Sequence, residues 1–287
     1  MDYPYYNKYV TGKKIISDFK KLQKFRPVNP LFIEINYTGL LPLIKITDYF
    51  SEECRVKCHF NKNLSPYEYY NLHREEYEEL NYLELDSKLN QDIRGCNNFP
   101  LPVTISVYKY FKPEKVLDFS AGWGDRLIGA IAYGCEYTGI DPSKCMQPKY
   151  KEIIDFFRKD PKEYKVVKKP FEDYNVKKDY YDLVFTSPPF FDLEIYENLS
   201  TQSVVKFNTL DKWKNNFLYP SLKKSYLSLK KGGHLAIYIS DYRKVRYIKD
   251  MKDYLKRFEY LKSVENIKWI NKDGSKYPRI IYVWGKT

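Results

Sequence analysis

The chain has few of the features that mark secreted or membrane proteins. Its 287 residues include only five cysteines, which are scattered rather than arranged in the dense, even set of a small disulfide-rich domain. No run approaches the roughly 18 to 20 consecutive apolar residues that a membrane-spanning helix needs. The first ten residues, MDYPYYNKYV, lack the basic stretch and following apolar stretch of a secretory signal. The sequence therefore predicts a folded intracellular protein of a reducing compartment that has no membrane partner. Its composition fits the cytoplasm and the nucleus equally.

Several catalytic chemistries also lack their motifs. Cytosine C5 methylation uses a cysteine nucleophile that follows a proline, and the chain contains no Pro-Cys pair. A nicotinamide-binding turn of the G-x-G-x-x-G type needs a small residue at position 127, which is occupied by Leu127. Cys54, Cys58 and His59 have the spacing of part of a zinc site, but a fourth ligand at suitable spacing is missing. We therefore interpret Cys54 and Cys58 as ordinary thiols and expect no metal.

Positive charge is concentrated in one segment. The chain has 49 basic and 37 acidic residues, and residues 206–262 alone contain 15 basic and 5 acidic ones. Basic residues beside a cleft gain affinity for a polyanion because binding releases counterions. The same residues on a solvated helix face need no ligand. Composition leaves both interpretations open.

Short β-rich runs alternate with longer helical stretches from residue 115 onward. Strands are expected over 115–119, 136–141, 165–169, 182–187 and 234–240, and helices over 126–133, 144–159, 213–229 and 246–258. The sequence KKGG at 230–233 is a helix stop. Two last runs, 264–270 and 279–284, flank the turn-rich residues 271–275 and predict a β-hairpin. The pattern is typical of an α/β fold in which helices cover a parallel sheet.

The first part of the chain lacks this alternation. We expect residues 1–110 to form a smaller N-terminal region with a possible role in substrate recognition, and residues 111–287 to form the main domain. Within the N-terminal region, the charged stretch 68–89 is expected to be helical.

The first motif that carries chemistry is VLDFSAGWGDR, which begins at residue 116. An apolar strand leads into a turn of small residues and then a helix, and Gly122 and Gly124 allow the backbone to approach a ligand closely. Asp141 follows Asp118 by 23 residues and ends the next expected strand, where a carboxylate can accept both hydroxyls of a ribose. These residues predict an adenosine-containing ligand, and an acidic pair at 172–173 follows the next strand, where it can face the adenine.

The second motif is DLVFTSPPFF, in which a strand ends at Ser187, Pro188, Pro189 and Phe190. The hydroxyl of Ser187 and the carbonyl of Pro188 are acceptors for an amino group, and Phe190 can stack on a flat base. The exocyclic amino group of a base is a poor nucleophile because its lone pair is delocalised. Acceptors for its hydrogens favour a tetrahedral nitrogen that attacks a methyl sulfonium, chiefly through positioning and electrostatics.

Together, and in this order, the two motifs resemble the S-adenosylmethionine-dependent amino methyltransferases of nucleic acids, which share [DNS]-P-P-[YFW]. The resemblance covers about residues 95–285. It implies a Rossmann-like, seven-stranded sheet that ends in an antiparallel hairpin, with S-adenosylmethionine as cofactor. Phe190 departs from the more usual tyrosine, which keeps the stacking surface but removes the hydroxyl. Serine at the first motif position is commoner in cytosine N4 enzymes and is compatible with adenine N6.

The resemblance also implies roles for individual residues. The cofactor-binding candidates are Asp118, Phe119, Ser120, Ala121, Gly122, Gly124, Asp141 and Pro142, with Glu172 or Asp173 beside the adenine and Phe99 in the segment before the first motif. The target-pocket candidates are Ser187, Pro188, Pro189 and Phe190. Only about 45 residues separate Asp141 from Ser187, so target recognition is expected from residues 1–110 or from the basic stretch after Ser187.

The function that these observations predict is methyl transfer from S-adenosylmethionine to adenine N6 or cytosine N4 in DNA. The target base is expected to leave the helix stack, while residues 206–262 contact phosphates. One alternative is an RNA adenosine N6 methyltransferase that acts on a cap or internal adenosine. Another is a catalytically silent nucleic-acid-binding subunit, which the retained Gly122 and Asp141 disfavour. The sequence identifies no protein partner.

Overall fold

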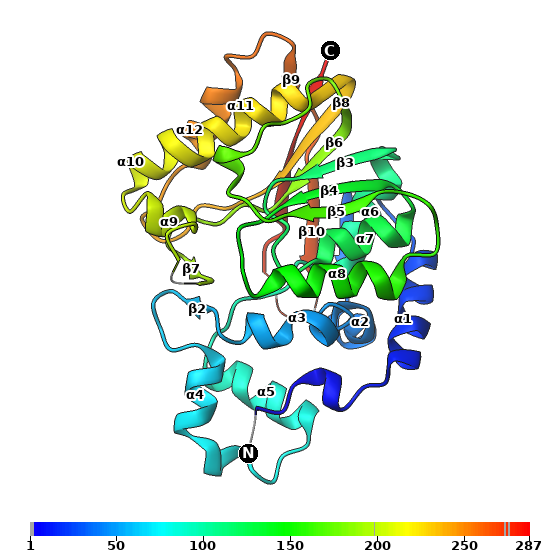
Figure 1. Cartoon of the computed structure of the whole chain (residues 1–287), viewed down its shortest axis with the longest axis vertical. Helices are drawn as coiled ribbons and strands as arrows, with labels where there is room; N and C mark the ends of the chain where they lie inside the picture. Colours follow the sequence, from blue (N-terminus) through cyan, green and yellow to red (C-terminus); the bar gives the residue numbers. More distant parts are fainter. Residues whose placement is uncertain (1–2, 198, 273, 275) are drawn as a thin grey trace.

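A large mixed β-sheet with helices on both faces forms the centre of the molecule (Figure 1). The computed structural model describes residues 3–197, 199–272, 274 and 276–287. Among these residues the sheet has nine strands, eight of them in the order β1-β10-β11-β8-β6-β3-β4-β5, with β9 paired to β11. The strands are β1 (Phe32–Ile35), β3 (Lys115–Asp118), β4 (Glu136–Ile140), β5 (Tyr164–Val167), β6 (Tyr181–Thr186), β8 (Leu229–Tyr238), β9 (Leu261–Ser263), β10 (Ile267–Asn271) and β11 (Arg279–Lys286). The expected α/β class is confirmed.

The expected strand number of seven is wrong for the described residues. All seven expected strands are present, and the final two form the expected antiparallel hairpin, with Ile267 opposite Ile281. Residues Asp273 and Ser275 of the expected turn lie outside the described residues. The two additional strands are β1, which pairs in parallel with β10, and the short β9, which pairs with the end of β11. Both are too short to give a clear pattern, and their pairing partners stabilise them.

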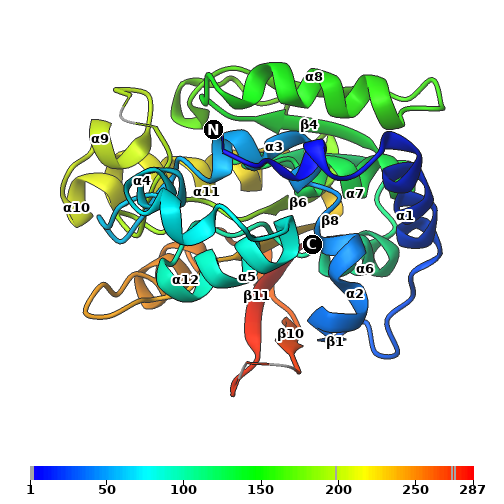
Figure 2. The same ribbon diagram turned by 90° about the horizontal axis from the view of Figure 1, so that it is seen from below.

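Two hydrophobic cores cover the two faces of the sheet. Successive strand residues alternate between them, so that Val116 contributes to one core and Leu117 to the other. The first core includes α6 (Leu101–Phe111), α7 (Asp125–Tyr133), α8 (Met146–Phe157) and side chains of the N-terminal region. The second includes α11 (Tyr219–Ser228) and α12 (Ile248–Leu255). Figures 1 and 2 show these helix groups on opposite sides of the sheet.

The helix expected over 213–229 is interrupted by a π-helical segment. The chain forms α9 (Ser203–Lys206), α10 (Leu210–Trp213), the π-helical segment η4 (Lys214–Leu218) and then α11. Phe217 in this segment is buried against Trp213, with ring centroids 5.4 Å apart. The expected helix stop is confirmed, because α11 ends at Ser228 and Gly232 takes a φ of +80° inside β8.

The N-terminal region consists mainly of short helices that lie below the sheet in Figure 1. Its elements are η1 (Tyr6–Lys8), α1 (Gly12–Lys24), α2 (Tyr37–Ile44), α3 (Asp48–Arg55), β2 (His59–Phe60), α4 (Pro66–Leu72), η2 (Arg74–Tyr77) and α5 (Tyr82–Asp92). The stretch 68–89, which was expected to be helical, is divided among α4, η2 and α5. Capping boxes begin α4 at Ser65 and α5 at Asn81, and each starts a new helix.

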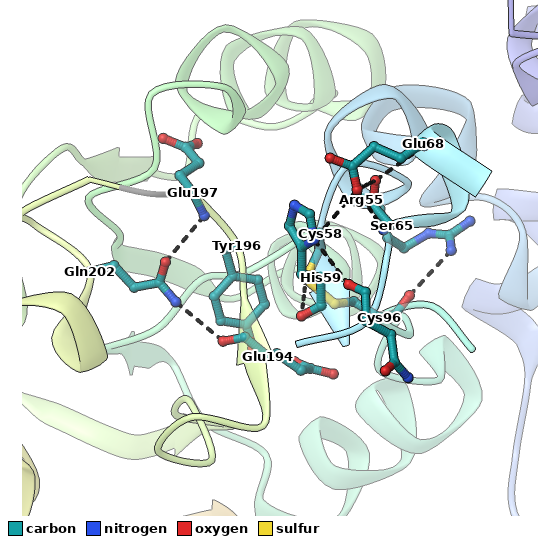
Figure 3. Close-up of a disulfide and its surroundings, with 11 residues drawn as sticks. Arg55, Cys58, His59, Ser65, Glu68, Cys96, Glu194, Tyr196, Glu197 and Gln202 are labelled. Carbon is teal, nitrogen blue, oxygen red and sulfur yellow. Dashed lines mark hydrogen bonds and ion pairs between the residues drawn. A yellow bond between two sulfur atoms is a disulfide. The ribbon is translucent and has the colours of Figure 1, made fainter. Parts of the chain in front are cut away.

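Four of the five cysteines form two disulfides. Cys54 bonds to Cys145, and Cys58 bonds to Cys96 (Figure 3). The interpretation of Cys54 and Cys58 as ordinary thiols is therefore wrong, and the cysteine spacing no longer supports a reducing setting. Their partners lie 91 and 38 residues away, so local spacing gave no sign of either bond. Cys135 is a buried free thiol, and burial raises its pKa to about 12.

No helix within the described ranges is both long enough and apolar enough to cross a bilayer.

Candidate functional site

Both sequence motifs lie at the carboxyl ends of neighbouring parallel strands. The first motif leaves β3 and the second leaves β6, and these strands pair side by side. The chain continues from β3 to β4 on one side and reaches β6 on the other, so the strand order reverses between them. Ligands of open α/β sheets bind at such a reversal. Two adjoining cavities are found here, and Ser187 lines both.

The first cavity is bounded by the ends of four strands. It encloses about 1010 Å³, part of which is open to solvent. Its lining includes Phe119, Ser120 and Gly122 after β3, Asp141 and Pro142 after β4, Phe171 and Glu172 after β5, and Ser187 and Pro189 after β6. The sequence candidates from four separate segments therefore come together around one space.

Asp141 connects the loops that follow β3 and β4. Its carboxylate accepts hydrogen bonds from the backbone N–H of Gly122 at 2.9 Å and of Ser143 at 2.9 Å. Burial raises the pKa of Asp141 to about 6, although both backbone hydrogen bonds favour the charged form. Gly122 has a φ of +59°, a left-handed conformation that favours glycine. The result is a buried carboxylate on the cavity wall with main-chain groups beside it.

Three of the cofactor candidates lie behind this wall. Asp118 is fully buried and accepts hydrogen bonds from Arg126 Nε and from the Tyr137 hydroxyl, each at 2.7 Å. Ala121 is buried, and Gly124 lies against α8, where a Cβ would approach Ile153 Cδ1 to 2.7 Å. None of the three lines the first cavity. Their positions suit them to shape and support the loop after β3.

Only one residue of the acidic pair after β5, Glu172 and Asp173, lines the first cavity. Glu172 lines the cavity, whereas Asp173 does not and keeps half of its side chain exposed. Lys206 Nζ bridges the two carboxylates at 3.1 Å each. Lys224 donates hydrogen bonds to the carbonyls of residues 171, 172 and 174 and holds the short helix η3 (Phe171–Asp173) in place. Of the two alternatives for the adenine-side residue, Glu172 has the position for it.

The second cavity has an aromatic lining. Phe190 lies 5.7 Å from Tyr238, and Tyr238 lies 6.0 Å from Trp269, measured between ring centroids. Pro188 also lines this cavity. Phe99 lies here as well, 5.4 Å from Tyr238, and not in the first cavity, where the resemblance had placed it near the cofactor. These rings are inclined to one another by 52–65° and form an aromatic wall beside Ser187.

Polar atoms without partners also belong to this second cavity. The indole Nε1 of Trp269 and the Oδ1 of Asn98 are buried and have no hydrogen-bond partner among the described residues. Both residues line the cavity. A buried polar group without a partner costs free energy of the order of 1–3 kcal/mol, which a ligand that hydrogen-bonds to it recovers. Both atoms are themselves buried, so a ligand in the cavity reaches this donor and this acceptor only when the groups that cover them move.

The segment after the second motif separates the two cavities. Tyr196 lines both, Glu194 lines the second, and Glu197 lines the first. Glu197 accepts a hydrogen bond from the backbone N–H of Cys145 at 3.0 Å and so fastens the segment to the start of α8. In Figure 3, Gln202 joins this segment through Glu197 N at 3.1 Å and Glu194 O at 3.2 Å.

Three aromatic residues that line the cavities are absent from the candidates expected from sequence: Trp123, Tyr196 and Trp269. Trp123 and Tyr196 line both cavities, and Trp269 reaches the second from the C-terminal hairpin. Trp123 stands inside the first motif and Tyr196 follows the second by six residues, so adjacency to the motifs was an available signal. Trp269 gave none, because only the pairing of β10 brings it to the site.

Comparisons with known proteins give matches among solved structures. No protein-family model and no curated protein matches the chain. Among solved structures, a putative S-adenosylmethionine dependent methyltransferase from Listeria monocytogenes matches 63% of this chain and 97% of its own at 16% identity, with a TM-score of 0.43. The 1,6-didemethyltoxoflavin-N1-methyltransferase of Burkholderia thailandensis, solved with S-adenosylhomocysteine, matches 78% of this chain and 92% of its own at 13% identity, with a TM-score of 0.46.

A third similar structure is TrmN from Thermus thermophilus, at 12% identity and a TM-score of 0.44. The match covers 66% of this chain and 49% of TrmN, so the chain spans about half the length of that protein. The α/β fold rests on the strand order described above, and the function rests on the site.

Proposed function

We propose that this protein transfers a methyl group from S-adenosylmethionine to the exocyclic amino group of a base, adenine N6 or cytosine N4, in DNA. The observation that supports this most directly is the position of Ser187. It stands where two cavities meet, one bounded by a buried carboxylate and glycine loop and the other by aromatic rings. A donor and an acceptor bound in the two cavities would face each other across this residue.

The first cavity fits the proposed cofactor. Asp141 has the charge and burial to accept ribose hydroxyls, and Glu172 lies one strand further along, where the adenine end would extend. The left-handed Gly122 keeps the loop after β3 free of a side chain at the cavity. When bound, S-adenosylmethionine supplies an electrophilic methyl group on a sulfonium.

In the second cavity the residues of this chain position the acceptor. Phe190 and Tyr238 offer stacking surfaces for a base, and the Ser187 hydroxyl and Pro188 carbonyl accept the hydrogens of its amino group. Because that edge of a base is paired and stacked in a duplex, the base must be extruded to enter. The amino proton leaves to solvent after transfer, so this proposal needs no basic side chain.

The unpaired indole of Trp269 gives a test of base recognition. We expect Trp269→Phe, which keeps a ring but removes the N–H, to raise KM for the nucleic acid about tenfold, because a hydrogen bond to the base is lost. The Kd for S-adenosylmethionine is expected to stay unchanged, since Trp269 does not line the first cavity. Steady-state methylation and calorimetry measure the two constants. An unchanged KM would mean that the indole N–H does not contact the target.

The function itself is tested by incubation with methyl-labelled S-adenosylmethionine and matched DNA and RNA pools, followed by nucleoside mass spectrometry. We expect N6-methyldeoxyadenosine or N4-methyldeoxycytidine. Label found only in ribonucleosides would replace DNA by RNA as the substrate. Nucleic-acid binding without affinity for S-adenosylmethionine would identify a silent subunit, and cofactor binding without label in either pool would overturn the nucleic-acid acceptor.

A further inference from the structure

Three arginines from separate parts of the chain line the second cavity. Arg94 precedes α6, Arg243 follows β8, and Arg279 is the first residue of β11. All three side chains are exposed. A fourth arginine, Arg126, also lines the cavity, but its guanidinium is bound to Asp118 at 2.7 Å. The first three therefore form an exposed cationic group, which we call the arginine rim.

The described carboxylates of this protein lie beyond ion-pair distance of the three rim arginines. Within the residues described by the structure, none of them forms an ion pair at 4.0 Å or less. The two carboxylates that line the same cavity have other partners. Asp125 accepts hydrogen bonds from Thr47 and from the backbone N–H of residue 99, and Glu194 accepts one from Tyr196. Glu194 also acts electrostatically on Arg94 from beyond ion-pair distance, so the charge of Arg94 is partly offset, whereas that of Arg243 and Arg279 is available to a ligand.

Aromatic faces hold two of the rim arginines. The guanidinium of Arg94 lies 4.3 Å from the ring centroid of Phe60, and that of Arg279 lies 4.5 Å from the centroid of Trp269. Stacking restrains a guanidinium while its N–H groups stay directed outward in the ring plane, where they can bind phosphate oxygens. Arg243 has a φ of +49°, a left-handed conformation that is uncommon for a residue other than glycine.

Five of the twelve lysines in the basic segment 206–262 form ion pairs with carboxylates of this protein. Lys206 binds Glu172 and Asp173, Lys214 binds Asp211 and Asp250, Lys230 binds Asp182, and Lys249 and Lys256 share Asp253. Of the basic residues in this segment, only Arg243 lines the second cavity. Phosphate contacts were expected from the whole segment. The lining of the second cavity instead contains Arg243 from this segment together with Arg94 and Arg279 from outside it.

We propose that Arg94, Arg243 and Arg279 bind the phosphates that flank the target nucleotide. This inference rests on the proposed function, because it takes the occupant of the second cavity to be a base within a nucleic-acid strand. An extruded base enters the cavity while its backbone stays at the mouth, and three guanidinium groups there match the charge of successive phosphodiesters. The rim positions the strand and carries no sequence information.

The test is the salt dependence of binding to fluorescent DNA and RNA oligonucleotides, measured for Arg94→Gln, Arg243→Gln and Arg279→Gln. Removing one positive charge that contacts a phosphate makes the slope of log K for binding against log salt concentration shallower by about 0.7 to 0.9. We expect each substitution to cause this change and to weaken binding about tenfold near 0.15 M salt. Arg279→Lys, which keeps the charge, is expected to retain most of the slope. Comparison of the two oligonucleotides distinguishes DNA from RNA as the source of the phosphates.

Two other exposed arginines, Arg246 and Arg257, provide matched control variants. Arg246 is exposed and lies three residues after Arg243 outside the cavity, and Arg257 is exposed and stacks on Tyr254 at 5.3 Å. Their glutamine variants are expected to behave as wild type, and an unchanged Kd for S-adenosylmethionine shows that each variant is folded. If wild type binds and methylates but the rim variants match the controls, the rim inference fails alone. If wild type shows no salt-dependent binding to either oligonucleotide, the nucleic-acid function fails with it.

Discussion

Ser187→Ala is expected to lower kcat for methyl transfer by about two to three orders of magnitude, while the Kd for S-adenosylmethionine stays within about twofold of wild type. The loss follows because the hydroxyl lines both cavities and is the side-chain acceptor for the amino group in the proposed reaction. Removing one preorganised hydrogen-bonding group at a reacting centre has effects of this size. Single-turnover methylation gives the rate, and calorimetry gives the affinity.

The neighbouring threonine provides a matched control. Thr186 precedes Ser187, is fully buried, lines neither cavity, and its hydroxyl has no hydrogen-bond partner among the described residues. Thr186→Val removes this hydroxyl and keeps the shape of the side chain, so the rate is expected to stay near that of wild type. If Ser187→Ala instead weakened cofactor binding as much as it slowed transfer, Ser187 would belong to the cofactor site and the pocket assignment would be wrong.

Asp141→Asn is expected to weaken binding of S-adenosylmethionine about 100-fold at pH 7.5. The substitution removes the charged acceptor for the ribose hydroxyls, and hydrogen bonds to charged groups contribute about 1.5–3 kcal/mol each. Asp173→Asn is the matched control, since Asp173 follows the next strand but lies outside the cavity. Its Kd is expected to equal that of wild type. Equal losses in both variants would point to a general charge effect and contradict the role of Asp141.

The raised pKa of Asp141 adds a pH dependence to the same experiment. Burial raises this pKa to about 6, so the carboxylate gains a proton as pH falls through 6 and the charged acceptor disappears. Wild-type affinity for S-adenosylmethionine is expected to be constant above pH 7 and about tenfold weaker at pH 5. Burial also raises the pKa of Asp125 to about 6, but Asp125 lines the other cavity. If the affinity of Asp141→Asn for S-adenosylmethionine does not change with pH, the pH dependence of wild type is due to Asp141. If the variant shows the same pH dependence as wild type, another group causes it.

The parts of the fold that sequence predicted are those with local signals. Strands such as β3 and β6 are apolar runs bounded by charged residues and by turns, and observed bounds differ from expected ones by one residue at the ends. The carboxyl ends of these strands then place Asp141 and Ser187 near one another without further information. The sequence candidates account for eight of the 23 residues that line the first cavity, and the others come mainly from segments without a recognisable motif.

The parts that sequence did not predict depend on contacts between distant residues. Strand β1 is only four residues long and forms against β10, more than 230 residues later. The disulfides link Cys54 and Cys58 to partners far along the chain. Arg94 and Trp269 reach the second cavity only through the arrangement of the folded chain. Trp269 stands in an expected strand, and Cys54 and Cys58 have the spacing of part of a zinc site, but neither pattern indicated the cavity or the disulfide partners that the folded chain brings to them.

The pairing of β1 with β10 has a consequence beyond the strand count. Without β1, the outer side of β10 would be an open edge whose free N–H and C=O groups can recruit strands from other molecules. Ile33 stands opposite Trp269 in this pairing, and Trp269 in turn stands opposite Arg279 on β11. The N-terminal segment thus covers the edge of β10, leaves the four-residue β1 as the edge strand, and holds in register the strand that carries Trp269 to the second cavity.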